Sequence, residues 1–319
     1  MSKISNTKGS FAIAVIVLIV VLVVAMAFVA VLFLPVKAVN FDESKSVPSS
    51  PGVNKITLRL NADAGEVRVI YANLNGTALN LHVTAKGAVG YLQDPNTISL
   101  NFVQSTSADT VSVNATLNVK DRLLGASNLN LHCDVTIDSS IRSRLNLSTG
   151  VGSVLVNTTN ASALDQLTLK ANTGAVTLRI APGVSLNGDI ALSTNIGASV
   201  LNWQNPTVNQ NIKVVATAKT GGVELQVNQT APMNRAVSLN GTTAVGGVSL
   251  NLGIAGNVGA SIDSKAEVGG VHVGSKTGFN GTDNALRSNN YPSTGNFGVN
   301  LTTKIGGVEV NAVGVPSKA

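Results

Sequence analysis

Residues 174–180 read Gly-Ala-Val-Thr-Leu-Arg-Ile, and this short pattern decides the fold. After the glycine, apolar side chains recur at every second position, at Val176, Leu178 and Ile180. Successive side chains of a β-strand point to opposite sides, so a period of two indicates a strand with one buried face. The sequence therefore predicts a strand that begins directly after a glycine.

A glycine that is followed by an alternating strand recurs along the chain. From Gly152 to Gly269 the intervals are 22, 23, 24, 25 and 23 residues. The last interval, to Gly306, is 37 residues, which we attribute to an insertion of loop-like sequence from Asn280 to Asn296. Each glycine is expected at a corner that needs an unusual backbone angle or a close approach. The predicted corners are Gly65, Gly152, Gly174, Gly197, Gly221, Gly246, Gly269 and Gly306.

A second short alternating arm precedes several corners, as at Leu167 and Leu169. One two-armed unit cannot bury its apolar face, whereas stacked copies can. We therefore predict an all-β fold, a parallel β-solenoid of ~22–25-residue Gly-x-Val rungs. Such ladders of Val, Leu and Ile leave little room for aromatic rings, which agrees with an aromatic content of 3%. The alternative is a β-sandwich whose hairpins have glycine turns.

The region 54–140 is less regular than the region 141–319, and we treat the two as an N-terminal β region and the solenoid repeats. Residues 129–138 alternate cleanly between apolar and polar side chains. The longer alternating runs 98–103 and 111–119 suit antiparallel pairing, and they could cover the first edge of the solenoid.

The N-terminus contains 24 consecutive apolar residues, Phe11 to Leu34. A helix of this length spans roughly 36 Å, enough for the hydrocarbon core of a bilayer. Lys3 and Lys8 precede the run without any acid, so residues 1–10 are expected in the cytoplasm and the rest of the chain outside. We predict a membrane helix over 11–35 and a Ser/Pro-rich linker over 36–53. The run is too long for an ordinary signal peptide, which favours an uncleaved anchor.

Two alternatives for this segment stay open. Val36-Lys37-Ala38 has the small residues that a signal peptidase requires, and Lys8-Gly9-Ser10-Phe11 resembles the processing site of type IV pilin-like proteins. The second alternative would make the chain a filament subunit.

Composition excludes several classes of function. The net charge of +6 comes from 22 cations and 16 anions without any basic cluster, so nucleic acid is not an expected partner. One cysteine excludes an internal disulfide framework, and three histidines leave little material for a metal or cofactor site. We expect no cofactor, no metal and no catalytic residue.

The stretch Val135–Asp138, followed by Leu145-Asn-Leu-Ser-Thr-Gly-Val-Gly-Ser-Val154 and the Gly-x-Val rungs, resembles the "putative adhesin" family of β-solenoid domains. It is also similar to the related toast-rack domains of bacterial and archaeal envelope proteins. The resemblance covers residues 55–315 and departs from the family pattern in its Asn-rich outer faces and the 280–296 insertion. It implies a cell-surface or envelope role and supplies no catalytic residues.

Three groups of side chains are candidates for modification or chemistry. Cys133 is in phase with apolar neighbours and is expected to be buried, whereas His82, His132 and His272 are expected to face outward on separate strands. Nine Asn-x-Ser/Thr sequons could accept N-glycans in an extracytoplasmic chain. They are Asn75, Asn114, Asn146, Asn157, Asn160, Asn228, Asn240, Asn280 and Asn300, of which Asn240 and Asn280 look most loop-like.

Acidic residues are candidates for catalysis because many β-solenoids cleave polysaccharides with clustered carboxylates. Asp134 and Asp138 are expected about 13 Å apart on one strand, which is too far for a glycosidase pair. Glu224 and Glu309 occupy the same place after a Gly-Gly-Val corner and could form a column, with Glu267 just before another corner. We expect no catalytic pair among these acids.

Taken together, the sequence favours a non-catalytic, adhesin-like surface protein with one membrane span, whose partners are surface glycans or envelope proteins. A polysaccharide-active enzyme is the alternative. The sequence does not indicate the oligomeric state.

Overall fold

The computed structural model describes residues 36–90, 98–120 and 129–315, and every regular element in these ranges is a β-strand. No helix suited to crossing a membrane occurs among these residues. The predicted membrane segment, 11–35, lies outside them.

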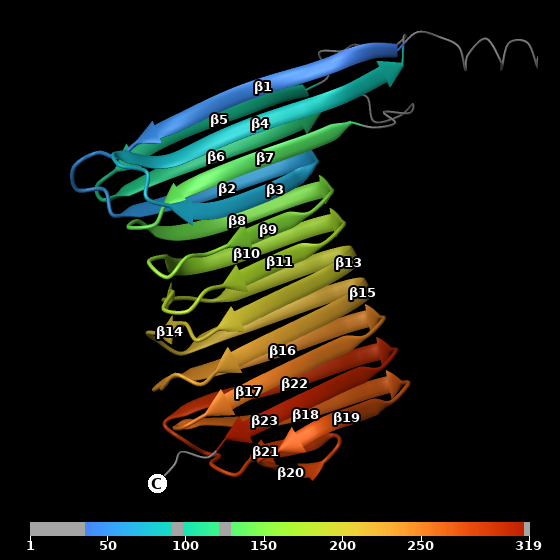
Figure 1. Ribbon diagram of the computed structural model, residues 1–319. Helices are drawn as coiled ribbons and strands as arrows, with labels where there is room; N and C mark the ends of the chain where they lie inside the picture. The colour runs from blue at the N-terminus through green and yellow to red at the C-terminus, as the bar shows by residue number, and fades with distance from the viewer. Residues whose placement is uncertain (1–35, 91–97, 121–128, 316–319) are drawn as a thin grey trace, which may run out of the picture.

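The strands stack as rungs, each with two arms that meet at a glycine (Figure 1). In β13 (Ile190–Gln204) and β15 (Ile212–Gln229) one strand runs through both arms, and Gly197 pairs with Gly221 at the corner. These strands pair in parallel along their whole length. Parallel rungs exclude the alternative of a β-sandwich built from antiparallel hairpins in this region.

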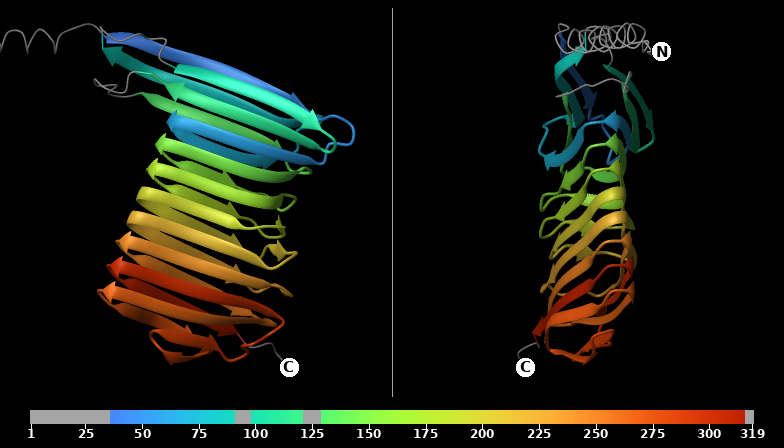
Figure 2. Two further views of the ribbon diagram at one scale, coloured as in Figure 1. Left: turned by 180° about the vertical axis from the view of Figure 1, so that it is seen from behind. Right: turned by 90° about the vertical axis from the view of Figure 1, so that its right-hand side faces the viewer.

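The arms form two faces of one continuous sheet, seen edge-on in Figure 2. The first face has the spatial order β5 (Ile98–Ser107), β6 (Thr110–Val119), β2 (Lys55–Ala64), β8 (Arg142–Val151), β10 (Ala163–Thr173), β13, β15, β16 (Ala236–Val245), β22 (Gly295–Ile305) and β18 (Val258–Val268). The second face has the order β1 (Val36–Pro48), β4 (Thr77–Gly90), β7 (Asn130–Asp138), β3 (Glu66–Ala72), β9 (Val154–Asn157), β11 (Val176–Ile180), β13, β15, β17 (Val248–Ala255), β23 (Val308–Val315) and β19 (Val271–Thr277). Short strands β12 (Ser185–Leu186) and β14 (Thr207–Val208) lie at the loop edge, opposite the corners, and β20 (Phe279–Thr282) and β21 (Ala285–Ser288) form a hairpin.

The core is a set of aliphatic ladders between the two faces, because the alternate residues of each arm point inward. Its largest fully buried side chains are Trp203 and Phe297, whose rings meet edge to face with centroids 5.8 Å apart. Trp203 donates its indole N–H to the buried Oε1 of Gln229 at 2.9 Å, so the polar group of this buried side chain has a hydrogen-bond partner.

Both ends of the stack depart from sequence order. At the first end, β2–β3 lies inside β6–β7, and β5 and β4 add antiparallel strands, as expected for the cover of the first edge. At the far end, β22–β23 returns between β16–β17 and β18–β19. The insertion expected at 280–296 as a loop contains the β20–β21 hairpin, which buries Phe279 and Leu286. The pairing of β2 with β8 also joins the two predicted β regions across residue 140.

The prediction of a linker over 36–53 is wrong for most of that range. Residues Val36–Pro48 form β1, which pairs antiparallel with β4 throughout. Val39 and Val47 are buried and Phe41 packs against the core, but Glu43 and Lys45 occupy the same phase and form an ion pair, so the sequence shows no apolar period of two. Pro48 is tolerated because it ends the strand.

Candidate functional site

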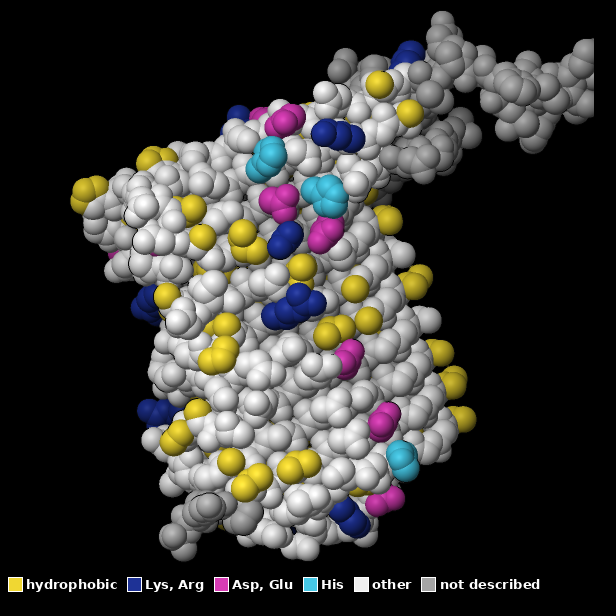
Figure 3. Space-filling view, viewed as in Figure 1, with side chains coloured by type: hydrophobic (Ala, Val, Ile, Leu, Met, Phe, Trp, Pro, Cys, Tyr) yellow, Lys and Arg dark blue, Asp and Glu magenta, His cyan; other side chains and the backbone are white. Residues whose placement is uncertain are grey.

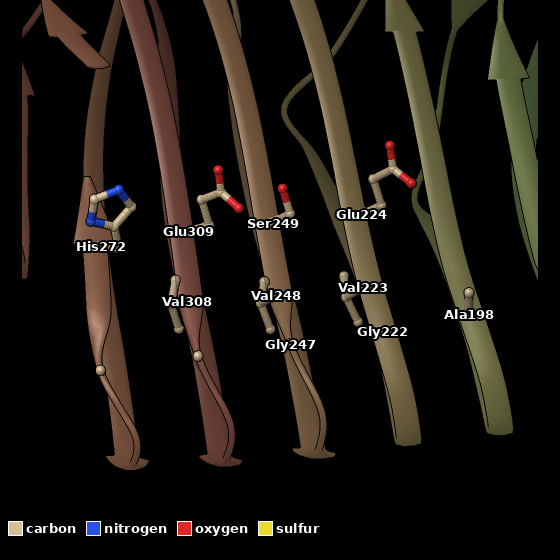
Figure 4. A pocket seen from close by; sticks show the side chains of 12 residues that line it. Ala198, Gly222, Val223, Glu224, Gly247, Val248, Ser249, His272, Val308 and Glu309 are labelled. Atoms are coloured by element: carbon tan, nitrogen blue, oxygen red, sulfur yellow. The ribbon is translucent and has the colours of Figure 1, made fainter. Parts of the chain in front are cut away.

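A shallow groove of about 480 Å³ crosses five rungs beside the corners, on the outer surface of the second face. Figure 4 shows its side chains projecting from β13, β15, β17, β23 and β19. Its long axis runs across the strands and therefore along the stack. The lining residues are Ala198, Gly222, Val223, Glu224, Gly247, Val248, Ser249, Gly270, His272, Gly307, Val308 and Glu309.

The first glycine of each Gly-Gly-Val corner is required by the backbone. All eight glycines expected at corners have a positive φ, between 104° and 138°. A Cβ at Gly246 would lie 1.8 Å from the carbonyl oxygen of Gly221, and the other corners from Gly152 to Gly306 show the same collision with a neighbouring glycine. Only glycine allows the corners to stack this closely.

The second glycine makes the floor of the groove, and nothing in the backbone requires it. Gly222, Gly247, Gly270 and Gly307 have no positive φ. A Cβ at Gly247 would meet no atom closer than 3.7 Å, and one at Gly270 would meet none within 4 Å. An alanine would fit at these positions, as Ala198 does at the equivalent position of β13, and a larger side chain would fill the groove. The groove is therefore a feature that the fold permits but does not need.

The outer wall of the groove is a column of polar side chains. The strand register places Glu224 beside Ser249, Ser249 beside Glu309, and Glu309 beside His272. The column expected from Glu224 and Glu309 is thus present. Amides of the next outward column hold both carboxylates, since Gln226 donates to Glu224 and Asn311 donates to Glu309 at 3.4 Å.

The placement of both glutamates on one wall does not suit glycoside hydrolysis. Glu224 and Glu309 are two strands apart, which places their backbones about 10 Å from each other. Retaining enzymes need carboxylates ~5 Å apart and inverting enzymes need ~6.5–9.5 Å on either side of the bond. Both glutamates also lie on one wall and do not face each other across the groove (Figure 4).

Beside the groove, and outside its lining, lies the edge at which the rungs turn. The residue before each corner glycine from Gly152 onward belongs to a register column along this edge. Its apolar members are strongly exposed, from 45% for Val245 to 63% for Val268. We call this column the corner ridge; it consists of Val151, Thr173, Ile196, Thr220, Val245, Ile305 and Val268.

The predicted glycosylation sites divide by exposure. Asn75 and Asn160 lie in exposed turns, and Asn280 is exposed on the β20–β21 hairpin. Asn240 is half-buried within β16 and accepts a hydrogen bond from Asn300, so it is not in a loop as expected. Asn114 and Asn300 are exposed on strands, and Asn146, Asn157 and Asn228 are half-buried on strands. Whether any of the nine carries a glycan stays a prediction.

Cys133 is buried in β7, and burial together with the nearby Asp134 raises the pKa of its thiol to about 12. His82 contacts Asp42 at 3.0 Å and His132 contacts Glu66 at 3.5 Å, whereas His272 is exposed on the groove wall. Among the described residues, no three His, Cys, Asp or Glu side chains come together in a group able to hold a metal ion.

A buried carboxylate with two cations is a feature that sequence reasoning missed. Asp165 binds Arg142 through Oδ1 at 2.9 Å and Lys55 through Oδ2 at 3.2 Å, and Asn187 also donates to it. Burial alone would raise the pKa of Asp165, but the hydrogen bonds from Arg142, Lys55 and Asn187 outweigh it and lower the pKa below its ordinary value. The cluster lies at the loop edge and ties together β2, β8 and β10.

Asp138 behaves in the same way and corrects an expectation. Its position four residues after Asp134 predicts a place on the same polar face, but Asp138 is buried at the end of β7 whereas Asp134 is exposed. Its carboxylate accepts hydrogen bonds from the backbone N–H groups of Leu74 at 2.8 Å and Ser140 at 2.9 Å. Burial alone would raise the pKa of Asp138, but the hydrogen bonds from Ser140 and Leu74 outweigh burial and lower this pKa below its ordinary value.

No protein-family model matches the chain, and no curated protein matches it. Solved structures with similarity include a putative cell adhesion protein from Clostridium sporogenes, with 14% identity, coverage of 86% of this chain and 99% of that chain, and a TM-score of 0.46. A putative adhesin from Bacteroides fragilis has 11% identity, coverage of 86% and 97%, and a TM-score of 0.29. A putative adhesin from Parabacteroides merdae has 12% identity, coverage of 84% and 95%, and a TM-score of 0.30. Likenesses this weak carry no conclusion about function.

Proposed function

We propose that this chain is a membrane-anchored, extracytoplasmic and non-catalytic surface protein of adhesin type, whose groove binds an extended polymer. The polymer is a surface glycan or an extended segment of an envelope protein. The β-solenoid provides a rigid support, and the apolar run 11–34 provides the anchor.

The groove is the observation that carries the proposal. It repeats similar chemistry across five rungs, so a ligand that fits it must also repeat or extend along the stack. Four of the five rungs add a floor glycine and a polar side chain of the wall, whereas β13 adds Ala198. Several weak contacts in line give useful affinity through multivalency, without the deep pocket that a small substrate requires.

The location rests on the charges that flank the apolar run. Lys3 and Lys8 precede the run and favour a cytoplasmic N-terminus, which places residues 36–319 outside. The exposed sequons of the loop edge, Asn75 and Asn160, suit an extracytoplasmic surface but do not establish it.

Groove filling tests the binding function. We expect Gly222→Val, Gly247→Val and Gly307→Val together to abolish co-sedimentation of the protein with purified envelope polysaccharide or with envelope proteins. Gly298→Val is the matched control, because Gly298 is exposed on the opposite face and a Cβ there would meet nothing within 4 Å. Equal binding by the groove variant and the wild type would contradict the proposal.

The filament alternative predicts a different mature protein. Cleavage at the pilin-like site would give a chain that begins at Ser10, whereas an anchored protein keeps residues 1–10. Intact mass of the protein from its native membrane separates the two.

A further inference from the structure

The corner ridge exposes more apolar surface than the fold requires. Five of its seven side chains are Val or Ile, each at least 45% exposed. Thr173 and Thr220 occupy the same column, so the stack accepts a polar β-branched residue at this position. The three distal members, Val245, Ile305 and Val268, are contiguous. Contiguous exposed apolar side chains mark an interaction surface.

Figure 3 shows this surface as a row of hydrophobic side chains along one edge of the molecule. Acidic side chains and a histidine lie on the adjoining face and set back from the edge, at the groove wall. The residues directly before ridge members include Lys219, Lys304 and Glu267, so this flank carries charges of both signs and does not select a strongly anionic or cationic partner.

The N-terminal strand starts on the same edge. Glu66, directly after the first corner, pairs with His132, and Asn130 pairs with Lys86. The β1–β4 pair continues four residues further in this direction, to the partners Val36 and Gly90. In Figure 1 the start of β1 and the distal corners extend toward the same side.

No spacer separates β1 from the predicted membrane segment. The apolar run ends at Leu34 and β1 begins at Val36, so the anchor must leave the solenoid at the corner edge. A short connection holds this edge close to the bilayer that contains the anchor.

We propose that the corner ridge contacts the surface of the lipid bilayer, so that the solenoid lies along the membrane with its corner edge down. The anchor fixes the near end and Val245, Ile305 and Val268 contact lipid at the far end. The loop edge then faces away from the membrane, and the groove runs parallel to the membrane surface. This inference rests on the anchor of the proposed function.

A second copy is a poorer occupant of the ridge. In a ridge-to-ridge pair, the corner edge of each copy faces the other, so each anchor would point at its partner. Both anchors would then leave β1 into the space between the two copies, and neither would enter a bilayer beside the pair directly. Lipid contact needs no such rearrangement, and aliphatic side chains enter the boundary between headgroups and acyl chains readily.

An environment-sensitive probe tests the contact in the full chain reconstituted into phosphatidylcholine vesicles. The fluorophore NBD is attached at Thr220→Cys in the ridge or at Gln210→Cys at the loop edge. The native Cys133 is buried and does not compete for the label. We expect blue-shifted emission and quenching by lipids with a nitroxide near the headgroup for the ridge probe, and neither effect for the loop-edge probe.

Substitution of the ridge provides the second arm. Ile196→Thr, Val245→Thr, Ile305→Thr and Val268→Thr should together abolish the quenching at position 220 while Trp203 fluorescence reports an intact fold. Val103→Thr with Val313→Thr is the control, because both side chains are exposed away from the ridge. Quenching should persist in that control.

The outcomes separate the inference from the function on which it rests. A ridge probe that is not quenched, in a protein that resists alkaline carbonate extraction, overturns the ridge contact and leaves the anchor. Extraction of the wild-type protein by carbonate overturns both. Cross-linking of Thr220→Cys between copies without lipid quenching assigns the ridge to a protein interface and also overturns the inference.

Discussion

At the residue scale, two adjacent glycines of one corner should respond in opposite ways to the same substitution. Gly246→Ala forces a side chain into a positive φ and against the Gly221 carbonyl, so we expect a loss of about 3 kcal/mol or more in the free energy of unfolding. Gly247→Ala meets only ordinary contacts and should stay within ~0.5 kcal/mol of the wild type. Urea unfolding followed by Trp203 fluorescence measures both. Similar losses in the two variants would contradict the assignment of roles.

The cysteine gives a second test at this scale. Because burial raises the pKa of the Cys133 thiol to about 12, almost no thiolate exists at neutral pH. We expect no reaction with Ellman's reagent in the native protein and one equivalent after denaturation in urea. Rapid reaction in the absence of urea would show that β7 is not packed as described.

Much of the residue-level detail could be predicted from the sequence, because residues at equivalent positions of successive repeats lie beside one another in the stack. The corner glycines and the shared column of Glu224 and Glu309 follow from the position of each residue within its rung. The Asp165 cluster could not be predicted in this way, since Lys55 lies 110 residues away and reaches Asp165 only because β2 pairs with β8.

At the scale of strands, this cluster should make stability sensitive to acid. The pKa of Asp165 is lowered in the folded state, so its contribution is complete above the ordinary value of 3.8 and is lost as the pH falls through the folded pKa. Asp165→Asn should cost about 2 kcal/mol at neutral pH, because it removes charge-assisted hydrogen bonds to Arg142 and Lys55.

The same substitution should flatten the decline of the unfolding free energy below pH 3.8. Asp138 has a lowered pKa as well and is unchanged in this variant, so part of the decline should persist. Urea titrations at several pH values between neutral and strongly acidic conditions check the result. An Asp165→Asn protein with the full acid sensitivity of the wild type would refute the role of the cluster.

Strands were predictable where a glycine and a period of two coincided. β1 was missed because its serines and proline look like a spacer by composition, and its two buried valines are separated by eight positions. Pairing with β4 supplies the hydrogen bonds that make it a strand, and a single sequence does not show that partner.

At the scale of the whole molecule, the C-terminal rung should be essential in a way that is unusual for a solenoid. Removal of a terminal repeat from an ordinary solenoid leaves the other repeats stacked. Here β22–β23 lies between two other rungs, so truncation after Thr294 leaves β16 and β18 without their shared partner. We expect loss of the cooperative unfolding transition by circular dichroism. A truncated protein with a sharp, nearly unchanged transition would contradict this topology.

The parallel stack follows from the constant interval near 23 residues, but the order of the end rungs does not. Gly269 and Gly306 have equivalent corner chemistry, and either order of their rungs buries the same ladders. Closure by the β20–β21 hairpin decides between them, because its strand β21 pairs with β18 and covers the end of the stack. That contact depends on three-dimensional packing and has no periodic signal.

Labelling of intact cells with a membrane-impermeant maleimide tests the central claim, that an anchored solenoid stands outside the membrane. Gln210→Cys reports on the loop edge and Ser2→Cys on the N-terminus, and native Cys133 is buried in both. We predict labelling at position 210 in intact cells, and labelling at position 2 only after lysis. Labelling at position 210 only after lysis would contradict the account.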